Sequence, residues 1–334
     1  MRDFDDWRMR RLMLIFGICP TRSGDDRSVN MLNEVIVKLV PFLPPKLVAR
    51  IARRYIAGET AAEGLALAEK LRRAGYASTM DILGEDTLTQ TQGADAAADY
   101  IHLMEGMGAL DLSRNVSLKL TQLGLRLSET VAFQNLETVL DAAHEHDVFV
   151  RIDMEDASIT DKTLEIYARA KALWPKVGTV LQARLKRTVR DAVALEGANI
   201  RLCKGAYKEP HDISYSLQRD IRRSYMDTFR TLIDNGAYVG VATHDLRLIQ
   251  RVRREIEASG IDRNQLEFQS LLGVPIRSTL ESLMAEGYKV RLYVPFGGAS
   301  LSYSMRRLAE NPGLALAIAK SILKRDRLDA ANLL

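Results

Sequence analysis

Apolar residues recur at helical spacing through the first 76 residues of the chain. Between Val29 and Leu39 they lie three or four positions apart, which is the period of an amphipathic helix. Thr60 and Glu63 form a capping-box pattern, a signature of a helix start. Strand patterns are almost absent from this part of the sequence. The pattern therefore predicts an N-terminal helical segment over residues 1–76, packed on whatever follows.

From residue 77 onward, short apolar runs alternate with amphipathic stretches of helical spacing. The runs cover residues 77–84, 116–123, 148–154, 178–185, 199–207, 238–245, 266–273 and 288–297. Eight strand–helix units within about 235 residues are typical of a (β/α)₈ TIM-type barrel. An open doubly wound α/β sheet is the alternative, but it would place a glycine-rich phosphate turn after its first strand, and residues 81–86 contain one glycine. The sequence predicts an α/β barrel over residues 77–311 and a C-terminal helix over 312–334.

Composition narrows the class of protein further. An apolar fraction of 47% among 334 residues excludes a disordered or collagen-like chain. The net charge of +4 is spread along the chain, which argues against a dedicated nucleic-acid binder. No apolar run approaches the roughly 20 residues needed to cross a bilayer. Cys19 and Cys203 are far apart and fit a pair of free thiols, so we expect a cytoplasmic protein.

Polar side chains interrupt seven of the eight apolar runs. Active sites of such barrels lie at the carboxyl ends of the strands, and a charge within an apolar strand is costly unless it is paired or used. The polar residues at these positions are Lys119, Asp153, Gln182, Arg201, Lys204, Thr243, His244, Asp245, Gln269 and Tyr293. Any one of them could equally serve as a structural partner inside the barrel, and a single histidine such as His244 is more often part of a core.

The number of cations distinguishes the predicted site. Lys119, Arg201 and Lys204 converge on one mouth of the predicted barrel, and Arg306 and Arg307 follow the last strand. Such a site favours anions: a substrate carboxylate, cofactor phosphates, or a ring that becomes negative on reduction. The sequence contains neither an HxH motif at a strand end nor a cluster of carboxylates, so we expect no metal.

Short motifs give these residues a family resemblance. In chain order, RLCKGAY, ATHD, EFQSLLG, RLYVPFG and YSMRRLAEN resemble the last strands and following helix of proline dehydrogenase, and MDILGE, SLKLTQLG, RIDMED and LQARLKR resemble its first four strands. The stretch RYIAGET is similar to the stand-alone form of that family. Each motif is weak by itself, but nine in order across residues 50–312 are specific.

The resemblance implies a function as well as a fold. Members of this family bind FAD in a (β/α)₈ barrel and oxidise L-proline to Δ1-pyrroline-5-carboxylate, the first step of proline catabolism. They pass electrons to a membrane quinone, which implies peripheral contact with the inner face of a membrane. A downstream pyrroline-carboxylate dehydrogenase would receive the product.

The resemblance also assigns flavin contacts to individual residues. Arg201 would lie beside the reactive N5 of the flavin, Lys204 beside its pyrimidine edge, and Glu310 on the adenosine ribose. The complete set of implied flavin contacts is Gln182, Arg201, Cys203, Lys204, Gly205, Ala242, Thr243, His244, Gln269 and Glu310. Lys208 stands where the fused enzymes have an aromatic residue on the adenine, so the resemblance leaves open how the adenine is held.

Substrate contacts follow in the same way. Lys119, Arg306 and Arg307 would hold the proline carboxylate, and Asp153 would support Lys119. Glu85 would pair with Arg306 as a gate. The residues implied to surround the pyrrolidine ring are Tyr207, Leu271, Tyr293 and Tyr303. The residues implied to carry the reaction are Lys119, Asp153, Arg201, Tyr293, Arg306 and Arg307.

The residues independently favour hydride transfer over covalent chemistry. Removing hydride from the carbon next to a secondary amine requires a neutral amine held rigidly rather than a strong base, and fixed cations favour reduction of a ring that becomes anionic. Two alternatives remain open. One is a Schiff-base aldolase or lyase with Lys119 or Lys204 as nucleophile. The other is a non-enzymatic scaffold whose helical N-terminus docks a partner.

Overall fold

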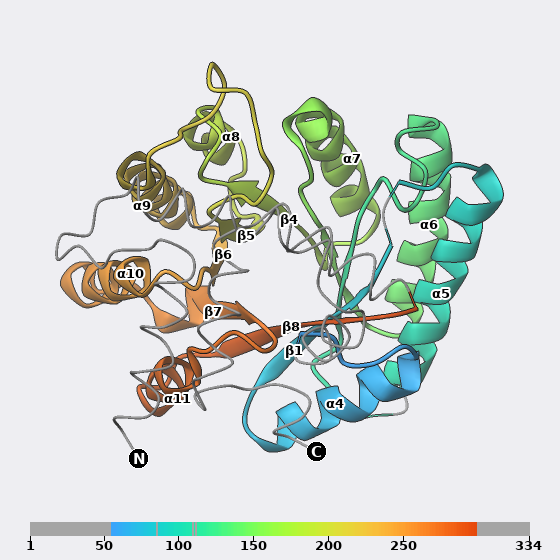
Figure 1. The fold of residues 1–334 in the computed structure, drawn as a ribbon, viewed down its shortest axis with the longest axis horizontal. Coiled ribbons are helices and arrows are strands. Elements are labelled where there is room, and N and C mark those ends of the chain that lie inside the picture. Colours follow the sequence, from blue (N-terminus) through green and yellow to red (C-terminus); the bar gives the residue numbers. More distant parts are fainter. Residues whose placement is uncertain (1–54, 85, 109, 111, 299–334) are drawn as a thin grey trace, which may run out of the picture.

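Eight parallel strands close into a barrel in the computed structural model of the protein, which describes residues 55–84, 86–108, 110 and 112–298 (Figure 1). The strands run in chain order around the barrel, and β8 pairs with β1. Their bounds are β1 Ala77–Ile82, β2 Asn115–Leu118, β3 Phe149–Ile152, β4 Val177–Gln182, β5 Asn199–Cys203, β6 Tyr238–Ala242, β7 Leu266–Leu271 and β8 Val290–Phe296. The predicted (β/α)₈ barrel is confirmed.

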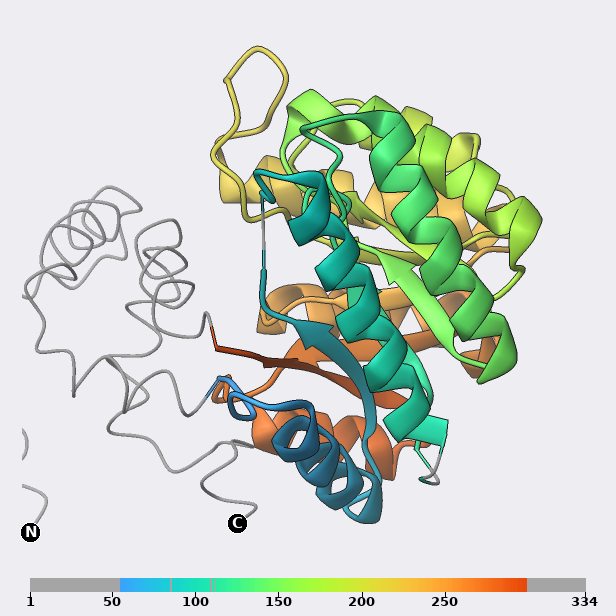
Figure 2. The ribbon, with the colours of Figure 1, turned by 90° about the vertical axis from the view of Figure 1, so that its right-hand side faces the viewer.

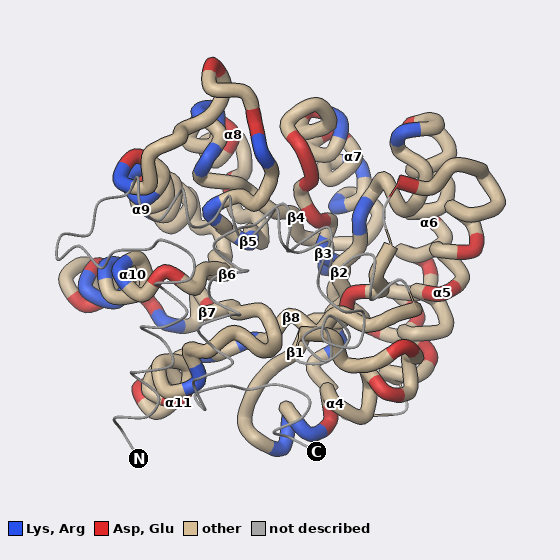
Figure 3. The backbone as a smooth tube through the Cα atoms, in the orientation of Figure 1, with Lys and Arg blue, Asp and Glu red and all other residues tan. Residues whose placement is uncertain are grey.

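Helices surround the barrel on its outside (Figures 1 and 2). They are α5 Gln90–Gly108, α6 Glu129–Glu145, α7 Thr160–Leu173, α8 Thr188–Val193, α9 Gln218–Asp234, α10 Leu246–Ser259 and α11 Arg277–Ala285, with short 3₁₀ helices η2 Ala157–Ile159 and η3 Arg263–Gln265. Figure 3 shows Lys and Arg interspersed with Asp and Glu around these outer helices. No helix in the described residues is both long and apolar enough to span a bilayer.

One helix precedes the first strand. Helix α4, Ala61–Arg73, begins at the predicted capping box, in which Thr60 Oγ1 accepts from Glu63 N–H and Glu63 in turn accepts from Thr60 N–H. Its buried face, which includes Leu67 and Leu71, packs against β1 and β8. The rest of the predicted N-terminal segment up to residue 54, and the predicted helix over 312–334, lie outside the described residues.

Each strand has two chemically different faces. In β5, Ile200 and Leu202 are fully buried among the apolar residues beneath the helices, whereas Asn199, Arg201 and Cys203 alternate with them. Because successive side chains of a strand point to opposite faces, the polar residues of β5 point into the barrel. Apolar side chains point toward the helices, and polar side chains point toward the barrel axis. This alternation explains why charged residues interrupt the apolar runs.

The barrel interior is polar rather than apolar. Hydrogen bonds cross it from strand to strand: Arg201 on β5 reaches Ser117 on β2 and Gln269 on β7. Barrels of this class are usually filled with branched apolar side chains. We divide the interior into an upper layer at the carboxyl ends of the strands, around Arg201, and a lower layer at their amino ends, around Arg151 and Arg291. Only the upper layer lies where barrel enzymes build active sites.

Candidate active site

Two cations and two carboxylates form the centre of the upper layer. Lys119 Nζ lies 3.0 Å from Asp81 Oδ1 and 3.9 Å from Asp153 Oδ2. Arg201 Nη1 lies 2.6 Å from Asp153 Oδ1. Lys119 is 3% exposed and Arg201 is 6% exposed, so these charges interact with little screening by water. We call Asp81, Lys119, Asp153 and Arg201 the charge network.

Further contacts hold Arg201 in one position. Its Nε donates to Gln269 Oε1 at 2.8 Å, and its Nη1 donates to Ser117 Oγ at 2.9 Å. The Tyr293 ring centroid lies 5.1 Å from the guanidinium carbon, and the Tyr293 hydroxyl donates to Asp153 Oδ2 at 2.9 Å. Because three strands, β2, β7 and β8, and the residue directly after β3 supply these partners, the guanidinium is held in one orientation.

The two carboxyl groups of the network have opposite electrostatic surroundings. Burial alone would raise the pKa of Asp153, but Arg201 and then Lys119 hold the pKa of that carboxyl below its usual range. Burial dominates at Asp81 and raises its pKa, although Lys119 opposes the shift. Asp81 is fully buried, and its Oδ2 has no hydrogen-bond partner among the described residues.

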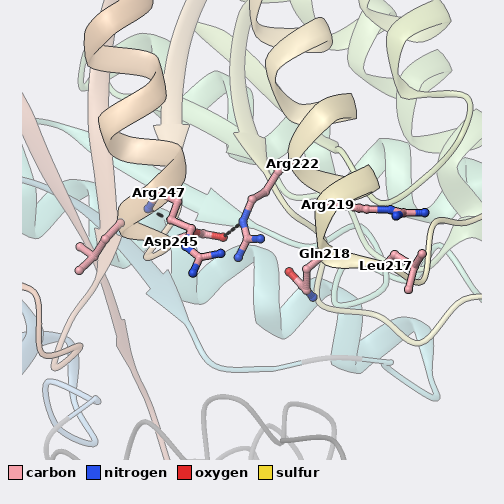
Figure 4. A pocket seen from close by; sticks show the side chains of 7 residues that line it. Leu217, Gln218, Arg219, Arg222, Asp245 and Arg247 are labelled. Atoms are coloured by element: carbon pink, nitrogen blue, oxygen red, sulfur yellow. Dashed lines mark hydrogen bonds and ion pairs between the residues drawn. The ribbon is translucent and has the colours of Figure 1, made fainter. Parts of the chain in front are cut away.

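A second cationic region lies between the first turns of α9 and α10 (Figure 4). It is a recess of about 670 Å³ lined by Leu217, Gln218, Arg219, Arg222, Asp245, Leu246 and Arg247. We call it the arginine recess. Three arginines and a single carboxylate, Asp245, line it; Asp245 Oδ2 lies 2.7 Å from Arg222 Nε, whereas Arg219 points away from Asp245 and its Nε lies 3.4 Å from Asp220 Oδ1 (Figure 4). The recess therefore retains an excess of positive charge.

Lys204 connects the arginine recess to the barrel mouth. Its Nζ lies 3.1 Å from Asp245 Oδ2 and donates to Gln218 Oε1 at 2.6 Å. Burial lowers the pKa of Lys204, and Asp245 partly opposes that shift. The lysine predicted to bind the flavin is thus already fixed by two residues of the arginine recess.

The end of β6 forms the next part of the mouth. His244 Nε2 accepts a hydrogen bond from the Leu271 backbone N–H at 3.0 Å. Burial, together with the positive charge of Lys204, lowers the pKa of His244 to about 4. Thr243 Oγ1 accepts from the Asp245 N–H at 3.1 Å, and Ala242 is the last residue of β6. The imidazole is therefore neutral near pH 7, with Nε2 as the acceptor.

The ends of β4 and β5 complete the mouth. Gln182 donates through Nε2 to the Glu155 carbonyl at 2.7 Å. Gly205 has φ of +97°, and a Cβ there would lie 3.1 Å from Gln182 Oε1, so the turn after β5 favours glycine. Burial raises the pKa of the Cys203 thiol to about 11, which makes it a poor nucleophile. The Tyr207 carbonyl accepts from Arg184 Nη1 at 3.1 Å.

The structure brings the described residues of the predicted site to one end of the barrel. Lys119, Asp153, Arg201, Gln269 and Tyr293 form one hydrogen-bonded and ion-paired group in its interior. The mouth above them is formed by Gln182, Cys203, Lys204, Gly205, Tyr207, Ala242, Thr243, His244 and Leu271. Five predicted residues lie outside the described part of the chain: Glu85, Tyr303, Arg306, Arg307 and Glu310.

Sequence reasoning missed two carboxylates of this region. Asp81 lies within the first apolar run and satisfies the same criterion as the residues that were selected, a charge inside an apolar strand. Glu155 follows β3 and accepts from both the backbone N–H and the hydroxyl of Thr121, at 3.2 Å and 2.5 Å. Its position in a loop gave no comparable signal. Among the described residues, no group of three or more His, Cys, Asp or Glu side chains is placed to hold a metal.

A closed barrel with a fixed cluster of cations at the carboxyl ends of its strands defines a (β/α)₈ barrel enzyme. The family model described as proline dehydrogenase matches residues 65–315. The chain belongs to the proline dehydrogenase family, and its activity is the oxidation of proline, the first step of proline catabolism.

Relatives of the chain carry the same name. Proline dehydrogenase 1 of Bacillus subtilis is 37% identical over 277 residues, which cover 82% of this chain and 91% of that protein. The proline dehydrogenase of Deinococcus radiodurans is 35% identical over 281 residues, covering 82% and 90%. The bifunctional protein PutA of Escherichia coli is 26% identical, and the match covers only 23% of its length. The resemblance to the stand-alone form is thereby confirmed.

Solved structures of other proteins share the fold of this chain. Proline utilization A from Bdellovibrio bacteriovorus, inactivated by N-propargylglycine, superposes with a TM-score of 0.74 at 25% identity, covering 91% of this chain and 39% of that one. The likeness extends over most of the present chain.

Proposed function

We propose that the protein oxidises L-proline to Δ1-pyrroline-5-carboxylate with FAD as the direct acceptor of electrons. The ring carbon next to nitrogen loses a hydride to flavin N5, the nitrogen loses a proton, and a carbon–nitrogen double bond forms. The single observation that carries this proposal is the charge network, in which Lys119 and Arg201 are both anchored on Asp153 at the mouth of the barrel.

The residues at the mouth fit an anionic dinucleotide. The arginine recess has three arginines against one carboxylate and lies at the first turns of two long helices, α9 and α10, whose N-termini favour anions. Its volume of about 670 Å³ exceeds what a single phosphate requires. We assign the diphosphate of FAD to this recess, next to Thr243 and His244.

Lys204 and Arg201 would then face the flavin ring. FAD, when bound, supplies the two-electron acceptor. Arg201 contributes a positive charge that Gln269, Ser117 and Asp153 hold in place, so no reorganisation is needed as negative charge develops on the ring. Fixed positive charge at this position favours reduction. Lys204, directly after β5, would contribute a second positive charge, which Asp245 and Gln218 hold in place.

The charge network would also position proline. Lys119 would bind the substrate carboxylate, assisted by Arg306 and Arg307, a role that rests on the family resemblance. Asp81 and Asp153 fix the Lys119 ammonium from below, so a charge-assisted bond to the carboxylate costs little side-chain entropy. Tyr293, Leu271, Tyr207 and Tyr303 would enclose the pyrrolidine ring, and Glu85 would pair with Arg306 as a gate.

No covalent intermediate is required by this arrangement. Lys204 is engaged by Asp245 and Gln218, and Lys119 by Asp81, so both ammonium groups already act as hydrogen-bond donors. A Schiff base would require a neutral, unengaged amine. Direct hydride transfer needs only a neutral substrate nitrogen held in a fixed orientation.

The visible spectrum tests the proposal. The purified protein should show flavin absorbance that L-proline bleaches without oxygen, and an Arg201→Gln variant should bleach at least a hundredfold more slowly. Lys162→Gln, an exposed change on α7, serves as the control and should match the wild type. N-propargylglycine should inactivate the wild type and alter its flavin spectrum. A colourless protein that borohydride links covalently to its substrate would contradict the proposal.

The remaining proposals rest on the family resemblance. Reoxidation by a membrane quinone would place the protein in the cytoplasm with peripheral contact at the inner face of the membrane. A pyrroline-carboxylate dehydrogenase would consume the product. Proline-dependent reduction of a soluble quinone analogue, measured without oxygen, tests the acceptor, and failure to reduce it would exclude quinone as the oxidant.

A further inference from the structure

A second concave site lies at the other end of the barrel. A bowl of about 530 Å³ opens at the amino ends of the strands, where Asn115, Phe149 and Asn199 begin β2, β3 and β5. We call it the amino-terminal bowl. It belongs to the lower layer of the interior and is separated from the substrate site by the charge network above it. Proline oxidation as proposed makes no use of it.

Cations outnumber carboxylates in the amino-terminal bowl. Its lining includes five cationic side chains, Arg114, Arg151, Lys176, Lys289 and Arg291, and two carboxylates, Asp147 and Glu267. These seven side chains come from five strands, β2, β3, β4, β7 and β8, or from the loops directly before them. The site thus carries an excess of positive charge on a concave surface.

Both carboxylates are already paired. Glu267 Oε1 lies 2.6 Å from Arg291 Nε, and Glu267 Oε2 lies 3.2 Å from Lys289 Nζ. Despite burial, which opposes the shift, Arg291 above all lowers the pKa of Glu267 to about 2. Asp147 forms an ion pair with Lys176. Neither carboxylate forms an ion pair with the two remaining arginines, Arg114 and Arg151, although each carboxylate attracts one of them at longer range.

Among the described residues, Arg114 and Arg151 donate hydrogen bonds only to neutral oxygens. Arg151 donates from Nη1 to the carbonyls of Thr179 and Asn199 at 2.8 Å and 2.7 Å, and from Nη2 to the Asn199 side chain. Arg114 donates from Nη1 to the His146 carbonyl at 3.0 Å. Neither forms an ion pair within the described part of the chain.

Arg151 is the more unusual of the two. It is 2% exposed, and its buried Nε has no hydrogen-bond partner among the described residues. Burial, with added repulsion from Arg201, lowers the pKa of this guanidinium to about 9. A buried charge without an opposite partner is costly, and a bound anion would offset that cost.

We propose that the amino-terminal bowl binds a small multivalent oxyanion, carrying phosphate or carboxylate groups, between Arg114, Arg151 and Lys289. Guanidinium groups bind such oxyanions through paired charge-assisted hydrogen bonds. The volume is within the range of small-molecule sites. The excess charge excludes cationic and neutral ligands as preferred occupants.

Calorimetric titration with inorganic phosphate tests this inference on the flavin-loaded protein, in which the mouth is occupied. Ionic strength is kept constant with sodium chloride. One saturable site is expected, and Arg114→Gln and Lys289→Gln should each weaken phosphate binding at least tenfold. Both variants change partly exposed side chains, and circular dichroism verifies that each is folded. A parallel titration with succinate shows whether phosphate or carboxylate groups are preferred.

Lys162→Gln, an exposed change on α7, is the matched control. It should leave phosphate binding unchanged, because Lys162 does not line the amino-terminal bowl. If Arg114→Gln and Lys289→Gln bound phosphate as tightly as Lys162→Gln, the phosphate site would lie elsewhere and the inference would be wrong. It would also be wrong if the heats of titration showed no saturation in the wild type. Flavin content and proline oxidation are measured on the same samples, so a failure here is distinguishable from a failure of the proposed function.

Discussion

Asp81 shows most clearly how a single residue can shape the site. It is buried, bonds Lys119 through one oxygen and leaves the other oxygen without a partner among the described residues. Burial raises its pKa, so keeping the carboxylate charged costs stability. A neutral side chain at this position would avoid the cost of burying a charge. We infer that Asp81 is a positioning residue, whose effect is to fix the ammonium of Lys119.

The Asp81→Asn variant tests that role. Loss of one charge-assisted hydrogen bond should raise the proline KM about tenfold, equivalent to about 1.4 kcal/mol, with a smaller change in kcat. Thr79→Val, on the same strand but in the lower layer, is the control and should alter stability without altering KM. Steady-state kinetics on both variants measures the separate effects on KM and kcat. An unchanged KM in Asp81→Asn would show that Lys119 needs no anchor.

His244 predicts a pH dependence of stability. Its pKa is lowered from 6.5 to about 4, so between these values the unfolded chain binds a proton that the folded protein does not. The contribution of His244 to the free energy of unfolding is therefore fully present above pH 6.5 and decreases as the pH falls toward 4. The loss amounts to about 3 kcal/mol at 1.36 kcal/mol per pKa unit. His244→Gln should lose less stability over this range. Thermal unfolding at pH 7 and pH 5 compares the two, and equal losses would refute the assignment.

At the level of elements, the close packing of β4 against its neighbours depends on a glycine. A Cβ on Gly178 would lie 2.5 Å from the Asn199 carbonyl and 2.5 Å from Arg151 Nη1. The backbone oxygen belongs to the paired strand β5 and cannot move alone. The lower layer of the interior therefore requires a residue without a side chain at this position.

Gly178→Ala should destabilise the protein by about 2 kcal/mol, because β5 and Arg151 must both shift. Gly298→Ala is the matched control, since a Cβ there meets no atom of the described residues within 4 Å. Thermal unfolding of both variants measures the difference. Equal midpoints would mean that the lower layer tolerates expansion.

The observed strands also show how much of the fold the pattern of apolar residues predicts. All eight apolar runs are strands, but the runs extend past the strands at their carboxyl ends: residues 199–207 were predicted and β5 is Asn199–Cys203. The excess belongs to the mouth, where Gly205 turns the chain. The alternation of polar and apolar residues continues from the strand ends into the loops of the mouth. Periodicity alone therefore does not show where each strand ends.

Pairing across the barrel could not be predicted from the sequence. Arg201 was selected as a cation at a strand end, but its partners Ser117 and Gln269 are 84 and 68 residues away. The lower layer was missed because Arg151 and Arg291 are charges near strand starts, away from the end where catalysis is expected. These side chains come into contact only when the barrel closes, so the sequence alone does not show which charged residues pair.

At the scale of the whole molecule, closure depends on the last strand. Six residue pairs join β1 to β8, from Ala77↔Arg291 to Ile82↔Phe296. Without β8, both β1 and β7 would become unpaired edges, and the interior ion pair of Arg291 with Glu267 would be lost. Stability is thus a property of the complete ring rather than of its individual units.

A chain ending at Gly287 should therefore fail to fold cooperatively. We expect it to retain helical far-ultraviolet dichroism but to lose the near-ultraviolet signal, to bind no flavin and to aggregate. Thermal scans monitored at both wavelengths check this expectation. A sharp unfolding transition in the truncated chain would show that seven strands suffice.

Ring closure also has a consequence during synthesis. Arg291 Nη1 donates to the Ser78 carbonyl across a separation of 213 residues. At 5–20 residues per second, the ribosome needs roughly 10–40 s to make that intervening stretch. The first strand spends this interval without its final neighbour, and we expect its unpaired edge to favour pairing between nascent chains until the eighth strand is made.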